Sequence, residues 1–357
     1  MSSVHTILQR ISAFFAVLNN LILIVLIIFK SHKKIGKYKY LMIYISIFEI
    51  IYAILDTCAV PEIYTTGSAF LVTVLGGQSF LPTYLCLLLS ELFCVLFGIS
   101  MAIFAIHFIY RYMVVSENKY LKKYDAHVIS FLLILPLLFG VFWFWVVDYF
   151  LTPFDKADKI LKEHFLDKMN INLTDVSYVG PYFWPIGKDG KTYVQWKSMF
   201  GILIMSIAIT VSFSTIFVFG YKCYRKTNEL IQSASQSESF NKLQTQLFYS
   251  LVLQTLIPVV LMHIPATIGF GASFFGVSFE FLGEMCAFTI CLYPALDPLP
   301  NFFIIKTYRD AILKYLRKFK SIILCKGATV DIEIVAMSDL GSASMTPKPA
   351  SLAAPIN

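Results

Sequence analysis

Charged residues are scarce in this sequence. They make up 14% of the chain, whereas 57% of its residues are hydrophobic and the mean hydropathy is +0.71. Soluble domains carry roughly a quarter charged residues, because their helices need a polar face toward water. The scarcity excludes an ordinary soluble domain. A helix in lipid needs no polar face, so the composition predicts an integral membrane protein.

Motifs that carry catalysis or bind metals are also missing. The seven cysteines include no CxxC pair, which excludes a zinc site or a disulfide framework. HExxH and GxSxG are absent, no pair of aspartates has a recognisable catalytic setting, and His107 and His263 are too isolated to hold a metal. We therefore predict no enzyme activity, no cofactor and no metal.

Seven apolar runs are long enough to cross a bilayer. About 20 residues at about 1.5 Å each span roughly 30 Å of hydrocarbon. The prediction is an all-α bundle of seven transmembrane helices, forming one domain over residues 1–305. The expected spans are Ile7–Phe29, Tyr40–Val60, Pro82–Tyr110, His127–Val147, Met199–Tyr221, Leu247–Phe270 and Phe281–Ile305.

Basic residues gather in alternate connections between these runs. If the N-terminus is outside, 21 of the 29 lysine and arginine residues fall on the cytoplasmic side, and the outer connections 61–81 and 271–280 carry none. Cytoplasmic loops are rich in lysine and arginine, so this orientation is predicted. The net charge of +7 therefore indicates a membrane rather than nucleic acid. The first run is no cleavable signal peptide, since five lysines follow it from Lys30 to Lys39.

The polar parts of the chain differ in character. The long outer loop 152–196 contains a glycosylation sequon at Asn172. Residues 306–326 alternate apolar and basic residues at helical spacing, which predicts an amphipathic helix on the inner membrane surface. Cys325 near its end is a candidate for palmitoylation or a free cytosolic thiol. The small, polar tail 327–357 is predicted to be disordered.

Three stretches of sequence carry a family resemblance. Tyr38–Tyr44 reads YKYLMIY, His107–Tyr112 reads HFIYRY, and Tyr293–Ile305 reads YPALDPLPNFFII. Together with the seven spans they resemble the nematode serpentine chemoreceptors of the Str class, which include the diacetyl receptor, over the chain to about Leu324. The resemblance implies a G-protein-coupled receptor architecture. It also implies an odorant or other chemical ligand, a heterotrimeric G protein as partner, and a place in the plasma membrane of sensory cilia.

The resemblance assigns roles at the inner end of the bundle. Arg111, followed by Tyr112, resembles the arginine of the Asp/Glu-Arg-Tyr motif, which contacts the G protein. Tyr110 replaces the acid, so an Asp–Arg pair within the helix is absent, and Arg111 is expected to pair with other inner-face groups at rest. Asp297-Pro298 resembles the Asn/Asp-Pro motif of the seventh helix, where the proline weakens the helix and offers a hinge.

Two of these assignments have open alternatives. Arg111 would also fit as an ordinary interfacial arginine that obeys the charge rule. Asp297 needs a partner, because an unpaired acid is costly within a membrane. The candidates are Asn20 in the first helix and Glu49 in the second.

The cysteines depart from the pattern of many such receptors. Cys86 lies where they place a cysteine bonded to the second outer loop, but no cysteine lies between Cys94 and Cys223. That bond is excluded. A Cys58–Cys86 disulfide is the alternative, and geometry decides it.

The ligand is expected between the outer halves of the helices. Ionisable groups at that depth are the best pointers, since their burial in lipid is costly. Each such group could equally make a helix–helix hydrogen bond or face interfacial water. A small volatile ligand would gain its affinity mainly from apolar burial. The candidate contacts, with two small residues that follow Glu91 on the same face of its helix, are Asp56, Glu91, Cys94, Gly98, His263 and Glu284.

Other classes fit less of the sequence. A ligand-gated channel of the insect odorant-receptor type also has seven helices, in the opposite orientation, and would leave Asn172 unglycosylated. A transporter would need an internal repeat and facing charges near the midplane, and neither is seen.

Overall fold

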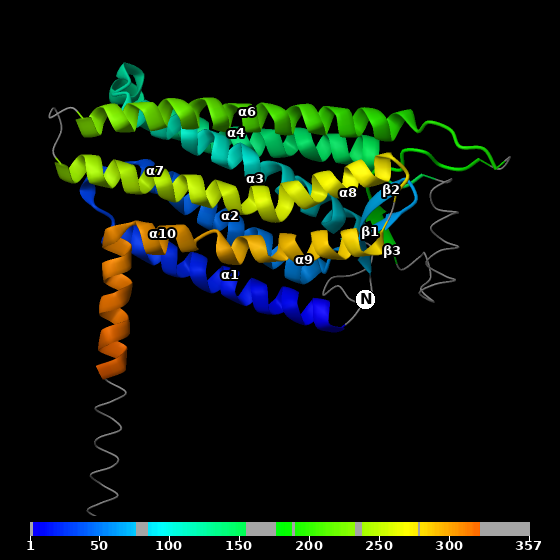
Figure 1. Ribbon diagram of the computed structural model, residues 1–357, viewed down its shortest axis with the longest axis horizontal. Coiled ribbons are helices and arrows are strands. Elements are labelled where there is room, and N and C mark those ends of the chain that lie inside the picture. The colour runs from blue at the N-terminus through cyan, green and yellow to red at the C-terminus, as the bar shows by residue number, and fades with distance from the viewer. Residues whose placement is uncertain are drawn as a thin grey trace, which may run out of the picture. The chain divides into compact units, whose positions relative to one another are not determined.

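Long helices dominate the computed structural model of the chain (Figure 1). It describes residues 3–75, 85–154, 176–187, 190–232, 238–277 and 279–321. The chain divides after Tyr308 into two units. The helical elements of the first unit are α1 (Ser3–Lys30), the short 3₁₀ turn η1 (Lys33–Ile35), α2 (Tyr38–Ala59), α3 (Cys86–Val115), α4 (Lys119–Leu151), α6 (Trp196–Gln232), α7 (Glu238–Pro258), the π-helical turn η4 (Val259–His263), α8 (Ile264–Phe274), α9 (Glu280–Leu296) and α10 (Leu299–Ile304).

The helices have the length and hydropathy of membrane spans. Over the described ranges, six helical stretches meet this test alone, with α7, η4 and α8 acting as one, and Phe281–Ile304 supplies a seventh together with Lys306–Ser321. Many large apolar side chains face outward, such as Phe217, which is 79% exposed, and Val141, which is 69% exposed. Such a surface suits lipid rather than water. The predicted seven-transmembrane, all-α fold is confirmed.

The helix ends differ from the predicted span ends because several helices continue past the apolar core. α6 runs over 37 residues, which is about 55 Å at 1.5 Å per residue and longer than the roughly 30 Å of hydrocarbon. Its last turns, from Lys222 onward, are polar and need not be in lipid.

Prolines interrupt the sixth and seventh spans. Pro258 has no backbone N–H to donate within its helix, and the π turn η4 begins directly after it. Between α9 and α10, Pro298 cannot donate to the carbonyl of Pro294. The Asn20 side chain in α1 donates to that carbonyl instead, at 3.1 Å, and Asn19 donates to the carbonyl of Ala295 at 2.9 Å. The first helix thus satisfies backbone groups that the break in the seventh sets free.

A small antiparallel sheet was not predicted. Its strands are β1 (Glu62–Thr66), β2 (Ala69–Leu75) and β3 (Val176–Val179), in the order β1-β2-β3. β1 and β2 form a hairpin whose turn contains Gly67 at φ +49°, a conformation that suits glycine. The connection 61–81 was expected to be an outer loop, and most of it is this hairpin.

The sheet rests on the ends of α8 and α9. The Phe70 ring lies 4.2 Å from that of Phe270, and a Cβ added at Gly269 would approach Phe70 to 2.5 Å. Thr65 Oγ1 donates to the carbonyl of Phe279 at 2.9 Å. Figure 1 shows the sheet at the same end of the bundle as the start of α1, and opposite the turn between α1 and α2. These are called the sheet end and the opposite end below.

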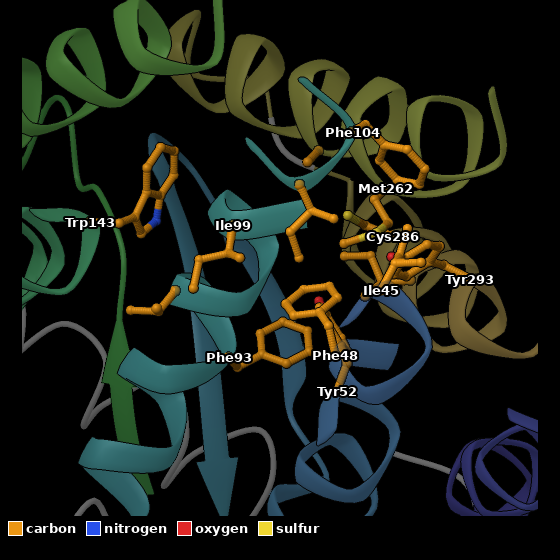
Figure 2. Packing of buried hydrophobic residues seen from close by; sticks show 14 of the residues in the cluster. Ile45, Phe48, Tyr52, Phe93, Ile99, Phe104, Trp143, Met262, Cys286 and Tyr293 are labelled. Atoms are coloured by element: carbon orange, nitrogen blue, oxygen red, sulfur yellow. The ribbon is translucent and has the colours of Figure 1, made fainter. Parts of the chain in front are cut away.

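Aromatic rings fill the centre between α2, α3 and α9. Tyr52 is fully buried, and its ring lies 5.7 Å from Phe93 and 5.9 Å from Tyr293. Figure 2 shows this group beside Phe48 and Ile45. Edge-to-face pairs of this kind add to the stability that apolar burial gives, so this core joins three helices that are far apart in the sequence.

Candidate functional site

A cavity of about 650 Å³ lies among α3, α4, α6, η4 and α8, toward the sheet end. Its size is typical of small-molecule pockets, which measure roughly 300–1,000 Å³. Most of its wall is apolar or aromatic. The described wall residues are Phe97, Trp143, Phe183, Met199, Ile202, Leu203, Met205, Ser206, Ile209, Thr210, His263, Ala266, Thr267, Phe270, Gly271 and Phe274.

The polar groups of this wall are few and mostly neutral. The Thr210 hydroxyl donates to the carbonyl of Ser206 at 2.7 Å, so its proton is already bound within α6. His263 is the ionisable side chain in the described wall. It is buried, with its ring centre 4.5 Å from that of Phe97, and Nε2 lies 3.3 Å from Ser100 Oγ. The cavity suits an apolar molecule with one polar group near His263.

Gly98 shapes the cavity from behind. A Cβ added there would overlap the indole ring of Trp143, which is fully buried and lines the cavity. Only a glycine on α3 lets α4 bring this ring so close. Gly98 was predicted to touch the ligand, and the structure instead gives it a role in the position of Trp143.

The other predicted ligand residues are spread around the sheet end. Cys94 lines a smaller hollow of about 50 Å³, which lies under the sheet beside the main cavity. Glu91 and Asp56 are buried but line neither hollow, and Glu284 is exposed and lines neither. Of the six candidate contacts, only His263 is among the described residues of the main cavity wall.

Sequence reasoning missed the aromatic wall of the cavity. Phe97 and Trp143 resembled lipid-facing or packing aromatics, because nothing in their spacing separates them from the many others. The signal that remained was Gly98, a small residue among large ones, which marks a close approach of two helices.

A second polar cluster, deeper in the bundle, surrounds Asp297. Gln254 Nε2 donates to Asp297 Oδ2 at 2.9 Å, and the Glu49 carboxyl lies beside that of Asp297. The expected contact with Glu49 is present, and Asn20 contacts Glu49 in turn. The cluster ties α2, α7 and the break before Pro298 together.

Arg111 is buried at the opposite end of the bundle, where it joins α3 to α7. It is 1% exposed, and its two terminal nitrogens donate to Gln244 of α7, one to Oε1 at 2.6 Å and one to the backbone carbonyl at 2.9 Å. Its guanidinium carbon lies 5.2 Å from the ring centre of Tyr38 in α2. The expected pairing of Arg111 with groups at that end is present, but the partner is an amide rather than an acid.

Tyr110 makes a separate contact at the same end. Its hydroxyl donates to Asp125 Oδ1 at 3.3 Å, and Lys37 Nζ lies 3.2 Å from the other carboxylate oxygen of Asp125. The residue in the usual place of the acid therefore binds α4, and leaves Arg111 to α7. Tyr112, beside it, packs edge-on against Phe219 of α6.

The remaining predicted positions have different outcomes. Cys86 is a buried free cysteine, so the disulfide left open between it and Cys58 is not formed. The glycosylation site Asn172, Cys325 and the tail 327–357 lie outside the described residues. A helix covers Lys306–Ser321, within the predicted amphipathic segment 306–326, and residues 322–326 are not described.

Comparison with known families decides the class of protein. The family of serpentine type seven-transmembrane G-protein-coupled chemoreceptors Str matches residues 5–313. The chain belongs to the Str family. This Str receptor is 34% identical to G-protein coupled receptor str-217 of Caenorhabditis elegans over 310 residues, which cover 87% of the chain and 89% of that protein. It is 30% identical to serpentine receptor class r-10 of the same organism over 288 residues, 80% of the chain and 83% of that protein.

Solved structures agree with the fold. Squid rhodopsin matches the Str receptor with a TM-score of 0.56 at 10% identity, over 86% of this chain and 78% of that one. Family and fold confirm that the protein is a membrane receptor of the G-protein-coupled type and not an enzyme. The predicted resemblance to the Str class is confirmed as well.

Proposed function

We propose that this Str receptor binds a small, largely apolar odorant in the 650 Å³ cavity and activates a heterotrimeric G protein at the end that holds Arg111. The observation that carries the proposal is the cavity itself, which is lined by aromatic and aliphatic side chains and whose described wall contains a single ionisable residue, His263. Burying about 200 Å² of ligand surface at about 25 cal/mol per Å² is worth about 5 kcal/mol. That gain supports reversible, weak binding of a small volatile molecule.

The distribution of charge supports the orientation of the receptor. The lysine cluster from Lys30 to Lys39 joins α1 to α2 at the opposite end, and the sheet end carries fewer basic residues near its helices. By the positive-inside rule the opposite end faces the cytoplasm. The ligand cavity then opens near the outside and Arg111 faces the G protein. The proposed location is the plasma membrane of chemosensory neurons, in their sensory cilia.

Activation in this proposal is a shift between two helix arrangements. In the described arrangement Arg111 is held by Gln244 of α7, and its Nε is buried without a hydrogen-bond acceptor among the described residues. An outward movement of α7 would break these contacts and expose the guanidinium. η4 and α8 continue from α7 and contribute His263 and Phe270 to the cavity wall. A ligand that binds the opened arrangement more tightly therefore favours it.

The roles of Asp297 and Pro298 follow from the same movement. At this break in the seventh span the Asp297 carboxyl lies beside that of Glu49, and Gln254 connects it to α7. In the proposal this break is the hinge at which α9 and α10 adjust when α7 moves.

An arginine substitution tests the proposal. Heterologous cells that express the receptor are screened with volatiles and soluble attractants, with calcium or cAMP as the readout. Arg111→Ala should abolish the evoked signal while surface expression stays normal, because the contact with the G protein is lost. Arg10→Ala, an exposed arginine in α1 near the sheet end, is the matched control and should signal normally. A full response from the Arg111 variant would refute its assigned role.

A further inference from the structure

The hydrogen bonds around His263 restrict the ligand more narrowly than the apolar wall does. His263 is the last residue of the π turn η4 and lies in the cavity wall between Phe97, at 4.5 Å between ring centres, and Phe213, at 5.7 Å. Both neighbouring rings are apolar. Among the described wall residues no acid or base accompanies it, so the imidazole is treated as neutral. A neutral imidazole has one nitrogen that donates and one that accepts.

Ser100 determines which nitrogen of His263 carries the proton. The Ser100 hydroxyl donates to the backbone carbonyl of Phe97 at 2.7 Å, and that carbonyl can only accept. A hydroxyl has a single proton, so while Ser100 keeps this bond its Oγ accepts from His263 Nε2, which lies 3.3 Å away. This arrangement of bonds places the proton on Nε2. The other nitrogen, Nδ1, is then the acceptor.

Nδ1 is left without a hydrogen bond among the described residues. Their hydrogen bonding with His263 consists of the contact between Nε2 and Ser100 on α3. The Thr210 hydroxyl, across the cavity on α6, has its own proton bound to the carbonyl of Ser206. An acceptor that faces an apolar cavity without a donor costs free energy, and a ligand can remove this cost.

We propose that the cavity selects ligands that carry a hydroxyl or N–H group, whose proton is donated to His263 Nδ1. Alcohols, phenols and oximes would then bind better than ketones, aldehydes or ethers of the same skeleton. The oxygen atoms of those compounds can only accept a hydrogen bond, and Nδ1 has no proton to donate to them. The inference rests on the proposed function and names the class of ligand that it takes. Ser100 is a positioning residue here, since it acts on the ligand only through the imidazole.

Matched pairs of compounds test the proposal. Medium-chain primary alcohols are compared with the aldehydes and methyl ethers of equal chain length, on the full receptor in heterologous cells with a calcium readout. The alcohols should be about 5- to 100-fold more potent, the range expected when a buried acceptor gains or loses its donor. Aldehydes or ethers that equal the alcohols in potency would overturn the inference.

Two substitutions separate the chemistry from simple loss of fold. His263→Phe should bring alcohol and ether to equal potency while the weaker, apolar response remains. Ser100→Ala frees the imidazole to carry its proton on either nitrogen, so aldehydes should gain potency relative to alcohols. Ser90→Ala is the control, because Ser90 is also buried on α3 and bonds the carbonyl of Cys86 at 3.0 Å, away from the cavity.

The outcomes distinguish this inference from the proposed function. If the receptor reaches the surface, as an epitope tag reports, but no compound of either kind evokes a signal, the proposed function fails and the inference fails with it. If both kinds evoke a signal without a preference for donors, only the inference fails. An unchanged preference in Ser100→Ala would also contradict it, because a purely structural serine would not set the selectivity ratio.

Discussion

Removing the side-chain oxygen of Gln244 should raise signalling in the absence of ligand. Arg111 donates to Gln244 Oε1 at 2.6 Å and to its backbone carbonyl at 2.9 Å, in a site where Arg111 is 1% exposed. Gln244→Leu keeps the backbone bond and the approximate volume of the side chain. The substitution leaves one terminal nitrogen of the buried Arg111 guanidinium without an acceptor. This loss applies only to the arrangement in which α7 lies close to α3, so it disfavours that arrangement.

The size of the effect follows from the type of hydrogen bond. A bond from a charged donor is worth about 1.5–3 kcal/mol, which corresponds to roughly 10- to 150-fold in the equilibrium between the resting and opened arrangements. A receptor that is about 1% open at rest would become about 10% open at the lower figure and more than half open at the upper one. Gln244→Glu should act in the opposite sense, because its carboxylate binds the guanidinium more strongly.

Ligand-free signalling per receptor at the cell surface is the measurement. Cells that express the receptor with a reporter of G-protein activity are compared at matched surface levels. Thr245→Val serves as control, since Thr245 is the next residue on α7 and its hydroxyl bonds the carbonyl of Asn241 at 2.9 Å, within the same helix. Equal basal signalling in Gln244→Leu, Gln244→Glu and the wild type would refute the idea that Gln244 restrains Arg111.

Two further predictions concern the sheet end. Gly98→Ala should shift Trp143 and destabilise the receptor by about 1–3 kcal/mol, the usual cost of overpacking. The control is Gly271→Ala, because Gly271 lies in the cavity wall with open space where its Cβ would be, and this variant should keep the stability of the wild type. Equal thermal stability of the two variants in detergent would contradict the argument. Burial raises the pKa of Glu62 in β1, and Glu284 nearby raises it further. The folded state then keeps this proton to higher pH than the unfolded state, so ionisation of Glu62 costs stability as pH rises above about 4. Glu62→Gln should therefore raise the melting temperature near neutral pH and leave it unchanged below about pH 4, whereas a pH-independent effect would contradict burial as the cause.

The helices were predictable because lipid imposes a simple rule on them. A span must be apolar over its whole length, so a run such as Ile7–Phe29 identifies itself by composition. The proline break at Pro298 and the contact between Asp297 and Glu49 also followed, since a buried acid must find a partner. These inferences needed no knowledge of how the helices pack.

The sheet was missed because its strands are short and lie between two spans. Glu62–Thr66 and Ala69–Leu75 are rich in β-branched and aromatic residues and are separated by a Gly-Ser turn, which is a hairpin signal. The connection was judged by its lack of lysine and arginine instead. Strand-forming residues in a short connection carry too little apolar length to stand out beside the spans.

The cavity was predicted only in part, because the criterion was the cost of burying a polar group. That criterion found His263, but it also chose Glu91 and Glu284, which line neither hollow. The wall is mostly apolar, and which aromatic rings face it depends on helix rotation. Likewise Arg111 was expected to pair with inner-face groups that the sequence could not name, and packing brings the amide of Gln244 to it.

The π turn at Val259–His263 has a consequence for how related sequences are aligned and drawn. Each residue of an α-helix advances the chain by about 100°, and a π turn places one extra residue in a single turn. A helical wheel drawn through residues 247–270 with one uniform period therefore rotates every side chain after His263 by about 100° from its true direction. A relative without this turn would need a one-residue gap there before Ala266 and Phe270 could be compared with their counterparts.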